Sequence, residues 1–97
     1  MTKADIIREV SNMTGLSKVE VEVVIEGGLA SISDSLKKGE RVDLRGFGSF
    51  IIKQRAAREA RNPATNEVVR LKERFIPAFK VSKILKENVN KSLLRGF

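Results

Sequence analysis

Residues 53–74 read KQRAAREARNPATNEVVRLKER, and this basic stretch is the most informative part of the chain. It contains seven Lys or Arg residues and three Glu residues, and it separates Phe47 and Phe50 from Phe75 and Phe79. A segment with so few apolar side chains cannot bury a core of its own. We therefore expect it to protrude from the folded body, and its charge favours contact with a polyanion.

A β-hairpin is the structure we expect for this segment, with its turn at residues 63–65 and its strands at 53–62 and 66–75. Period-2 alternation then places three basic residues on one face of the ribbon: Arg70, Lys72 and Arg74. In one register Arg58 lies opposite Arg70. The other face would pair opposite charges, Arg55 with Glu73 and Arg61 with Glu67.

Ten residues per strand give an arm of roughly 30 Å at about 3.3 Å per residue, which is long enough to follow a groove around a duplex. An isolated two-stranded ribbon is only marginally stable in water. We therefore expect the arm to be mobile until DNA orders it. A disordered basic linker is the alternative interpretation of the same residues. At the tip, Pro63 either serves the turn through its fixed φ or acts as an apolar wedge between base steps.

The composition of the 97 residues bounds the function. Residues 1–40 hold 5 basic and 7 acidic residues, whereas residues 41–97 hold 14 basic and 5 acidic residues, so the overall charge of +7 is concentrated on one part of the chain. Such a distribution is typical of proteins that bind nucleic acid or anionic membranes. The chain has no Cys and no His, which argues against an enzyme and against a metal site. We expect no cofactor and no small-molecule substrate.

The rest of the chain predicts an α+β fold. Thr2 with Asp5, and Ser17 with Glu20, form capping boxes that open two helices, and glycines close them at Gly15 and Gly39. Strands follow at residues 41–44, 49–53 and 76–80, and Pro77 indicates an edge strand. A basic helix is expected at about residues 82–94. Gly27 and Gly28, inside the second helix, suggest close helix packing.

Two nucleic-acid motifs are present only in part. Arg45-Gly46-Phe47-Gly48 matches the opening of the RNA-recognition signature, but Ser49 occupies the position of a stacking aromatic residue. The two opening helices could form a helix-turn-helix, but Glu20 and Glu22 at the front of the second helix would repel phosphate. We favour a hairpin turn for the first motif and a structural role for the two helices.

The chain resembles the HU and integration host factor family of bacterial DNA-bending proteins, over nearly all its length to about Asn90. The resemblance is carried by five motifs: residues 39–42 (GERV), 46–50 (GFGSF), 55–58 (RAAR), 61–65 (RNPAT) and 77–80 (PAFK) with Lys83, Leu85 and Lys86. The family usually has Gly at three positions where this chain has Ala60, Asn66 and Ser82. Asn tolerates positive φ, and Ser82 is able to cap the last helix.

The resemblance implies an intertwined dimer, formed with an identical or a related chain, with a helical base, short antiparallel sheets and two β-ribbon arms. It implies one domain over residues 1–97, with a body (1–52 and 76–97) and an arm (53–75). It also implies a cytoplasmic protein of the bacterial nucleoid, without membrane contact. The expected dimer core contains Leu29, Ile32, Leu36, Leu44, Phe47, Phe50 and Phe79.

The resemblance further implies bending of double-stranded DNA, largely without sequence preference, through minor-groove arms with intercalation by Pro63. Arg55, Arg58 and Arg61 would contact phosphates or the groove, and the flank where bent DNA returns would carry Lys3, Lys80, Lys83 and Lys86. To these we add Arg45, Lys53, Asn62, Arg70, Lys72 and Arg74 as expected DNA contacts. The alternatives are a sequence-specific subunit of an integration-host-factor-type heterodimer and an RNA-associated basic protein.

Overall fold

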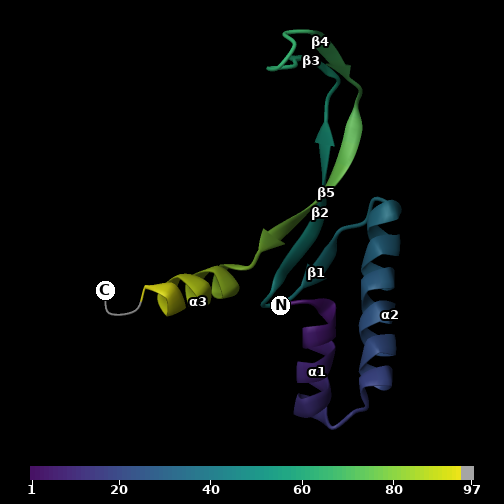
Figure 1. Ribbon diagram of the computed structural model, residues 1–97, viewed down its shortest axis with the longest axis vertical. Coiled ribbons are helices and arrows are strands. Elements are labelled where there is room, and N and C mark those ends of the chain that lie inside the picture. Colours follow the sequence, from purple (N-terminus) through teal and green to yellow (C-terminus); the bar gives the residue numbers. More distant parts are fainter. Residues whose placement is uncertain (95–97) are drawn as a thin grey trace.

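The computed structural model describes residues 1–94 of the 97, so the end of the C-terminal tail (95–97) lies outside the described residues. The elements are α1 (Lys3–Thr14), α2 (Lys18–Lys37), β1 (Val42–Leu44), β2 (Gly48–Arg55), β3 (Arg58–Arg61), β4 (Val68–Leu71), β5 (Arg74–Val81) and α3 (Lys83–Leu93). Figure 1 shows α1 and α2 side by side at the base, a long arm of β2 to β5 above them, and α3 projecting to one side. The predicted α+β class is confirmed.

Local capping fixes the ends of the helices. Thr2 Oγ1 accepts a hydrogen bond from the Asp5 N–H at 3.3 Å, and the Asp5 carboxylate accepts one from the Thr2 N–H at 2.9 Å. This backbone bond from Thr2 is the main reason why the pKa of Asp5 lies below its ordinary value. Ser17 and Glu20 form the second box, so both predicted capping boxes are confirmed.

A left-handed glycine follows the last residues of α2. Gly39 has φ 81°, and its N–H donates to the Leu36 carbonyl at 3.0 Å, while the Glu40 N–H donates to the Ser35 carbonyl at 2.9 Å. This pair of bonds is a Schellman motif, which satisfies carbonyls that the helix leaves unpaired. The chain then turns back from α2 into the sheet.

The main sheet has the antiparallel order β1-β2-β5, and Pro77 lies opposite Ile52 on the edge strand β5. The predicted edge position of Pro77 is thus confirmed. Both long strands extend further than the sequence predicted, β2 to Arg55 and β5 from Arg74. They extend because each supplies the other's hydrogen-bonding partners along the lower part of the arm, even where their side chains are polar.

Gly48 is required where β2 meets β5. A Cβ atom at this position would lie 2.5 Å from Cζ of Phe79 and 2.6 Å from the carbonyl oxygen of Lys80. We predict that Gly48→Ala lowers the free energy of unfolding by about 1–3 kcal/mol, because the added methyl group must displace backbone as well as the ring. Chemical denaturation measures this, and a midpoint equal to that of the wild type would contradict it.

Very little of the described chain is buried by the chain itself. Only Ile7 and Val21 are buried apolar residues among residues 1–94. The accessible surface is 8381 Å², whereas a compact monomer of this mass exposes about 5,500 Å². The radius of gyration is 19.2 Å, against about 12.5 Å for a compact domain of this length. The fold is therefore extended, and its apolar side chains remain largely accessible.

The residues expected in a dimer core follow this pattern. Phe79 packs its ring against Phe47 and Phe50, with centroids 5.3 and 5.1 Å apart. Even so, Phe47 is 50% exposed and Phe79 is 44% exposed. Leu29 and Leu44 are exposed as well, and Ile32, Leu36 and Phe50 are half-buried. At Gly27 and Gly28 an added Cβ would meet no other atom within 4 Å, so no close packing at these glycines arises within residues 1–94.

Candidate nucleic-acid interface

The arm ends in a turn that presents Pro63. The Asn62 N–H donates to the Glu67 carbonyl at 2.9 Å, and the Asn66 N–H donates to the Asn62 carbonyl at 2.7 Å. The Asn62 side-chain oxygen accepts a hydrogen bond from the Ala64 N–H at 2.9 Å, as in an Asx turn. Pro63 is exposed between these anchored residues. The turn therefore holds an apolar ring at the end of the arm.

Asn66 has φ 59° and is the one non-glycine residue with positive φ among residues 1–94. The tolerance expected of asparagine at this position is confirmed. The left-handed residue makes the turn four residues long, 63–66, rather than three. Asn62 consequently lies across from Glu67 and not from Asn66.

The predicted register of the arm was therefore wrong by one residue. Arg58 lies opposite Leu71, and Glu59 is the residue opposite Arg70, with 3.6 Å between Glu59 Oε1 and Arg70 Nε. Arg61 lies opposite Val68 instead of Glu67 and donates to the Asn66 side-chain oxygen at 3.3 Å. Arg55 lies opposite Arg74, while Glu73 accepts a hydrogen bond from Gln54.

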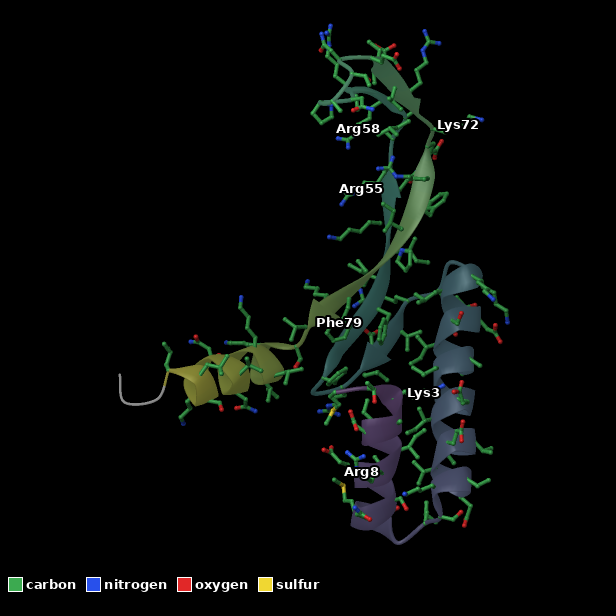
Figure 2. The ribbon with its side chains drawn as sticks, viewed as in Figure 1. Lys3, Arg8, Arg55, Arg58, Lys72 and Phe79 are labelled. Atoms are coloured by element: carbon green, nitrogen blue, oxygen red, sulfur yellow. The ribbon has the colours of Figure 1, made fainter. Side chains whose placement is uncertain are left out.

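The predicted continuous strand through residues 66–75 was also wrong. The β3–β4 ladder ends at Arg58 and Leu71, and the β2–β5 ladder begins at Arg55 and Arg74. Arg70, Lys72 and Arg74 thus belong to β4, the connection and β5, and no single strand aligns them on one face. Figure 2 shows Arg55 and Arg58 extending from one side of the arm and Lys72 from the other.

A second basic surface lies where the arm joins the base. A cavity of about 440 Å³ is lined by Arg41, Asp43, Arg45, Ser49, Lys80 and Lys83, among others. Ser82 shapes it, because its hydroxyl donates to the Gly46 carbonyl at 3.0 Å while accepting from the Leu85 N–H at the start of α3. The predicted capping role of Ser82 is confirmed. The two hydrogen bonds of its side chain fix the position of Lys83, the first residue of α3.

Three polar residues of this surface were missed by the sequence analysis. The Asp43 carboxylate accepts hydrogen bonds from the Ser49 hydroxyl at 2.6 Å and from Arg41 at 2.9 Å. The bond from Ser49, followed by that from Arg41, holds the pKa of Asp43 below its ordinary value. The alternation of Arg41, Asp43 and Arg45 in the sequence could have revealed Arg41 and Asp43, but it gives no sign of Ser49 on the next strand.

Every expected DNA contact is exposed except Arg74, which is half-buried. Lys3 lies at the base, where its ammonium donates to the Glu26 carboxylate, and this bond raises the pKa of Lys3. Lys53 lies in β2 opposite Ile76, and Lys86 lies on α3. The structure thus brings together Arg55, Arg58 and Arg74 at the arm, and Arg45, Lys80 and Lys83 at its root.

Two absences concern the part of the chain that the structure describes. Within residues 1–94, no helix is long and apolar enough to cross a membrane. Over the same range, no cluster of three or more His, Cys, Asp or Glu side chains is placed to hold a metal ion.

Minor-groove architectural proteins combine basic side chains with apolar residues that wedge between base steps, and integration host factor and HU are among the examples from which that generalisation is drawn. The family model described as "Bacterial DNA-binding protein" matches residues 1–90. The chain belongs to this family, the HU and integration host factor family of architectural DNA-binding proteins, as the resemblance implied. Members of this family bind DNA in the bacterial nucleoid and are not enzymes.

HU proteins and integration host factor subunits are both similar to the chain over most of its length. Integration host factor subunit beta of Marinobacter nauticus is 43% identical over 98 residues and is covered completely, as is this chain. DNA-binding protein HU of Clostridium pasteurianum is 41% identical, with 94% of this chain and 100% of the relative covered. The HU chain of an Anabaena HU–DNA cocrystal structure superposes with a TM-score of 0.85 at 35% identity, over 92% of this chain and 97% of that chain.

Proposed function

We propose that two copies of this chain clamp one DNA duplex between their arms and bend it by inserting Pro63 into the minor groove, largely without sequence preference. The observation that carries the proposal is the exposed Pro63 at the end of a basic arm, held by the Asn62 and Asn66 hydrogen bonds. An apolar wedge between base steps costs a few kcal/mol of unstacking, which the wider protein contact of a bent duplex offsets. The HU relative in the Anabaena cocrystal has DNA bound.

Dimer formation is supported by the surface that one chain leaves open. The surface of one chain exceeds that of a compact monomer by about 2,900 Å², whereas obligate dimers bury about 2,000–5,000 Å² or more over both partners, which is roughly half that per chain. Exposed Leu29, Phe47 and Phe79 supply apolar side chains of the kind that such interfaces bury. We propose that they form the dimer core with Ile32, Leu36, Leu44 and Phe50.

Within this proposal the chain forms one domain whose body (1–52 and 76–97) supports the arm (53–75), and it acts in the nucleoid. The arm supplies Lys53, Arg55, Arg58, Arg61, Asn62, Arg70, Lys72 and Arg74 to the minor groove and its phosphates. The flanks supply Lys3, Arg45, Lys80, Lys83 and Lys86. Because these contacts displace counterions, affinity falls steeply as salt rises.

Replacing Arg58 and Arg61 together with glutamine tests the phosphate contacts. Each phosphate contact contributes about 0.9 to the slope of log affinity against log salt, so the double variant is expected to lose up to about 1.8 per protein arm. Fluorescence anisotropy at several salt concentrations measures the slope. Arg8→Gln, on α1 and paired with Asp5, is the matched control and should keep the wild-type slope. An unchanged slope for the double variant would show that neither Arg58 nor Arg61 contacts a DNA phosphate.

Sequence-specific bending by a heterodimer subunit is the second candidate. Integration host factor beta subunits are among the relatives, and Arg41, which donates to Asp43 at 2.9 Å, lines the same cavity as Arg45, so two guanidinium groups of the kind that read guanine lie at the root of the arm. Competition between random duplexes and an enriched sequence distinguishes the two candidates. The same assay with duplex RNA as competitor tests the RNA-associated alternative.

A further inference from the structure

The lower part of the arm has two unlike faces. β2 pairs with β5 from Gly48 to Arg55, and successive side chains of a strand point to opposite faces. One face of this ladder therefore carries its basic side chains, which are Lys53, Arg55, Arg74 and Lys80. The other face carries mostly apolar side chains, among them Phe50, Ile52, Phe75, Pro77 and Phe79. All the expected DNA contacts of β2 and β5 thus lie on the face opposite Phe75.

A groove lies on the apolar face, where the arm meets the C-terminal end of α2. This α2–arm groove has a volume of about 430 Å³ and is lined by Leu36, Lys37, Lys38, Ile52, Phe75 and Pro77, among others. Figure 1 shows the end of α2 on one side of the root of the arm and α3 on the other. Phe75 is 66% exposed and is not part of the ring cluster around Phe79. The groove therefore continues the apolar face beyond this cluster, and of the lining residues named only Leu36 belongs to the proposed dimer core.

The rim of the groove is positively charged. Lys37 and Lys38 are both exposed at the end of α2. Neither ammonium group makes an ion pair within residues 1–94, although Asp34 and Glu40 are close in sequence. Interfaces place apolar side chains against an apolar centre and opposite charges at the rim. The groove is therefore complementary to apolar side chains that are flanked by carboxylates.

We propose that the α2–arm groove binds an acidic segment of another protein. The segment places apolar side chains against Ile52 and Phe75, and carboxylates beside Lys37 and Lys38. Pro77 lacks the N–H that an added strand would need at this edge of the sheet, so side chains rather than strand pairing make the contact. Because the groove and the basic side chains occupy opposite faces of the ladder, the protein holds DNA and the acidic segment at the same time.

The first test uses a short fluorescein-labelled peptide of alternating leucine and glutamate, followed by fluorescence anisotropy. The full chain is titrated alone and after saturation with a nicked duplex, which covers the basic face of the arm. The peptide should bind saturably, with the same affinity in both states. A matched peptide of alternating leucine and lysine should not bind the groove of the DNA-free protein. Absence of saturable binding, or release of the glutamate peptide by the duplex, would overturn the proposal.

Variants of the full chain show whether the peptide occupies the groove. Phe75→Ala should weaken its binding about tenfold or more, because an apolar contact is lost. Lys37→Gln combined with Lys38→Gln should weaken it about two- to fivefold and remove most of its salt dependence. Lys91→Gln changes a lysine in the last turn of α3, is the matched control, and should leave binding unchanged. Equal affinities for Phe75→Ala and the wild type would place the peptide elsewhere and contradict the proposal.

The second test asks whether a second copy of the chain covers the groove instead. Methyl NMR signals of Leu36 and Ile52 are followed as the glutamate peptide is added, and sedimentation gives the mass of the protein at each step. The Ile52 signal should shift along the binding curve while the number of chains per particle stays constant. Separation of the chains by the peptide, or an Ile52 signal that does not move, would show that the groove is no docking site for another protein.

Discussion

Replacing Phe79 with alanine is expected to abolish the proposed dimer and to lower the free energy of unfolding by about 3–5 kcal/mol. The Phe79 ring lies against Phe47 and Phe50, and against the position where Gly48 has no side chain. Because small domains are stable by only about 5–15 kcal/mol, such a loss populates unfolded chains. Denaturation at several protein concentrations, with sedimentation of the native protein, measures both effects.

Phe75→Ala is the matched control for this variant. Phe75 lies on the same edge strand, is 66% exposed, and is not part of the three-ring cluster. Because Phe75 makes neither of the ring contacts of this cluster, its replacement should cost less stability than that of Phe79, and the proposed dimer should remain intact. Similar losses for Phe75→Ala and Phe79→Ala would show that the ring cluster has no special place in the interface.

Replacing Pro63 with alanine is expected to reduce binding and bending of an intact duplex far more than binding to a nicked one. In the intact duplex the protein must unstack a base step, which costs a few kcal/mol and requires the wedge. A nick supplies the kink in advance, so the arm contacts form without the wedge. Gel-shift titrations on both substrates measure the ratio.

Ala64→Ser is a control within the same turn, because it leaves the proline and the backbone hydrogen bonds of Asn62 and Asn66 in place. It should behave as the wild type on both duplexes. Equal loss of affinity on intact and nicked DNA for Pro63→Ala would remove the wedge role from Pro63, while leaving phosphate binding by the arm untouched.

The sequence predicted those features that depend on neighbouring residues. The capping boxes at Thr2 and Ser17 were predictable because cap and acceptor lie three residues apart. The edge position of Pro77 was predictable because proline lacks the N–H that a central strand needs. The family motif around Pro63 located the tip of the arm.

Features that depend on pairing across the chain were predicted less well. The register of the arm is set by the left-handed conformation of Asn66, which lengthens the turn by one residue. A one-residue shift changes every cross-strand pair, and so Arg55 meets Arg74 rather than Glu73. The Asp43–Ser49 hydrogen bond likewise joins two strands, and the sequence alone shows only the alternation on one of them.

The most direct test of the central claim, that two chains bend one duplex, is energy transfer between dyes at the two ends of a short intact duplex. DNA has a persistence length of about 150 bp, so a much shorter duplex is nearly straight when free. Titration with the wild-type protein should raise the transfer efficiency and saturate at two chains per duplex. Saturable binding with an unchanged end-to-end distance, or saturation at one chain per duplex, would contradict the claim.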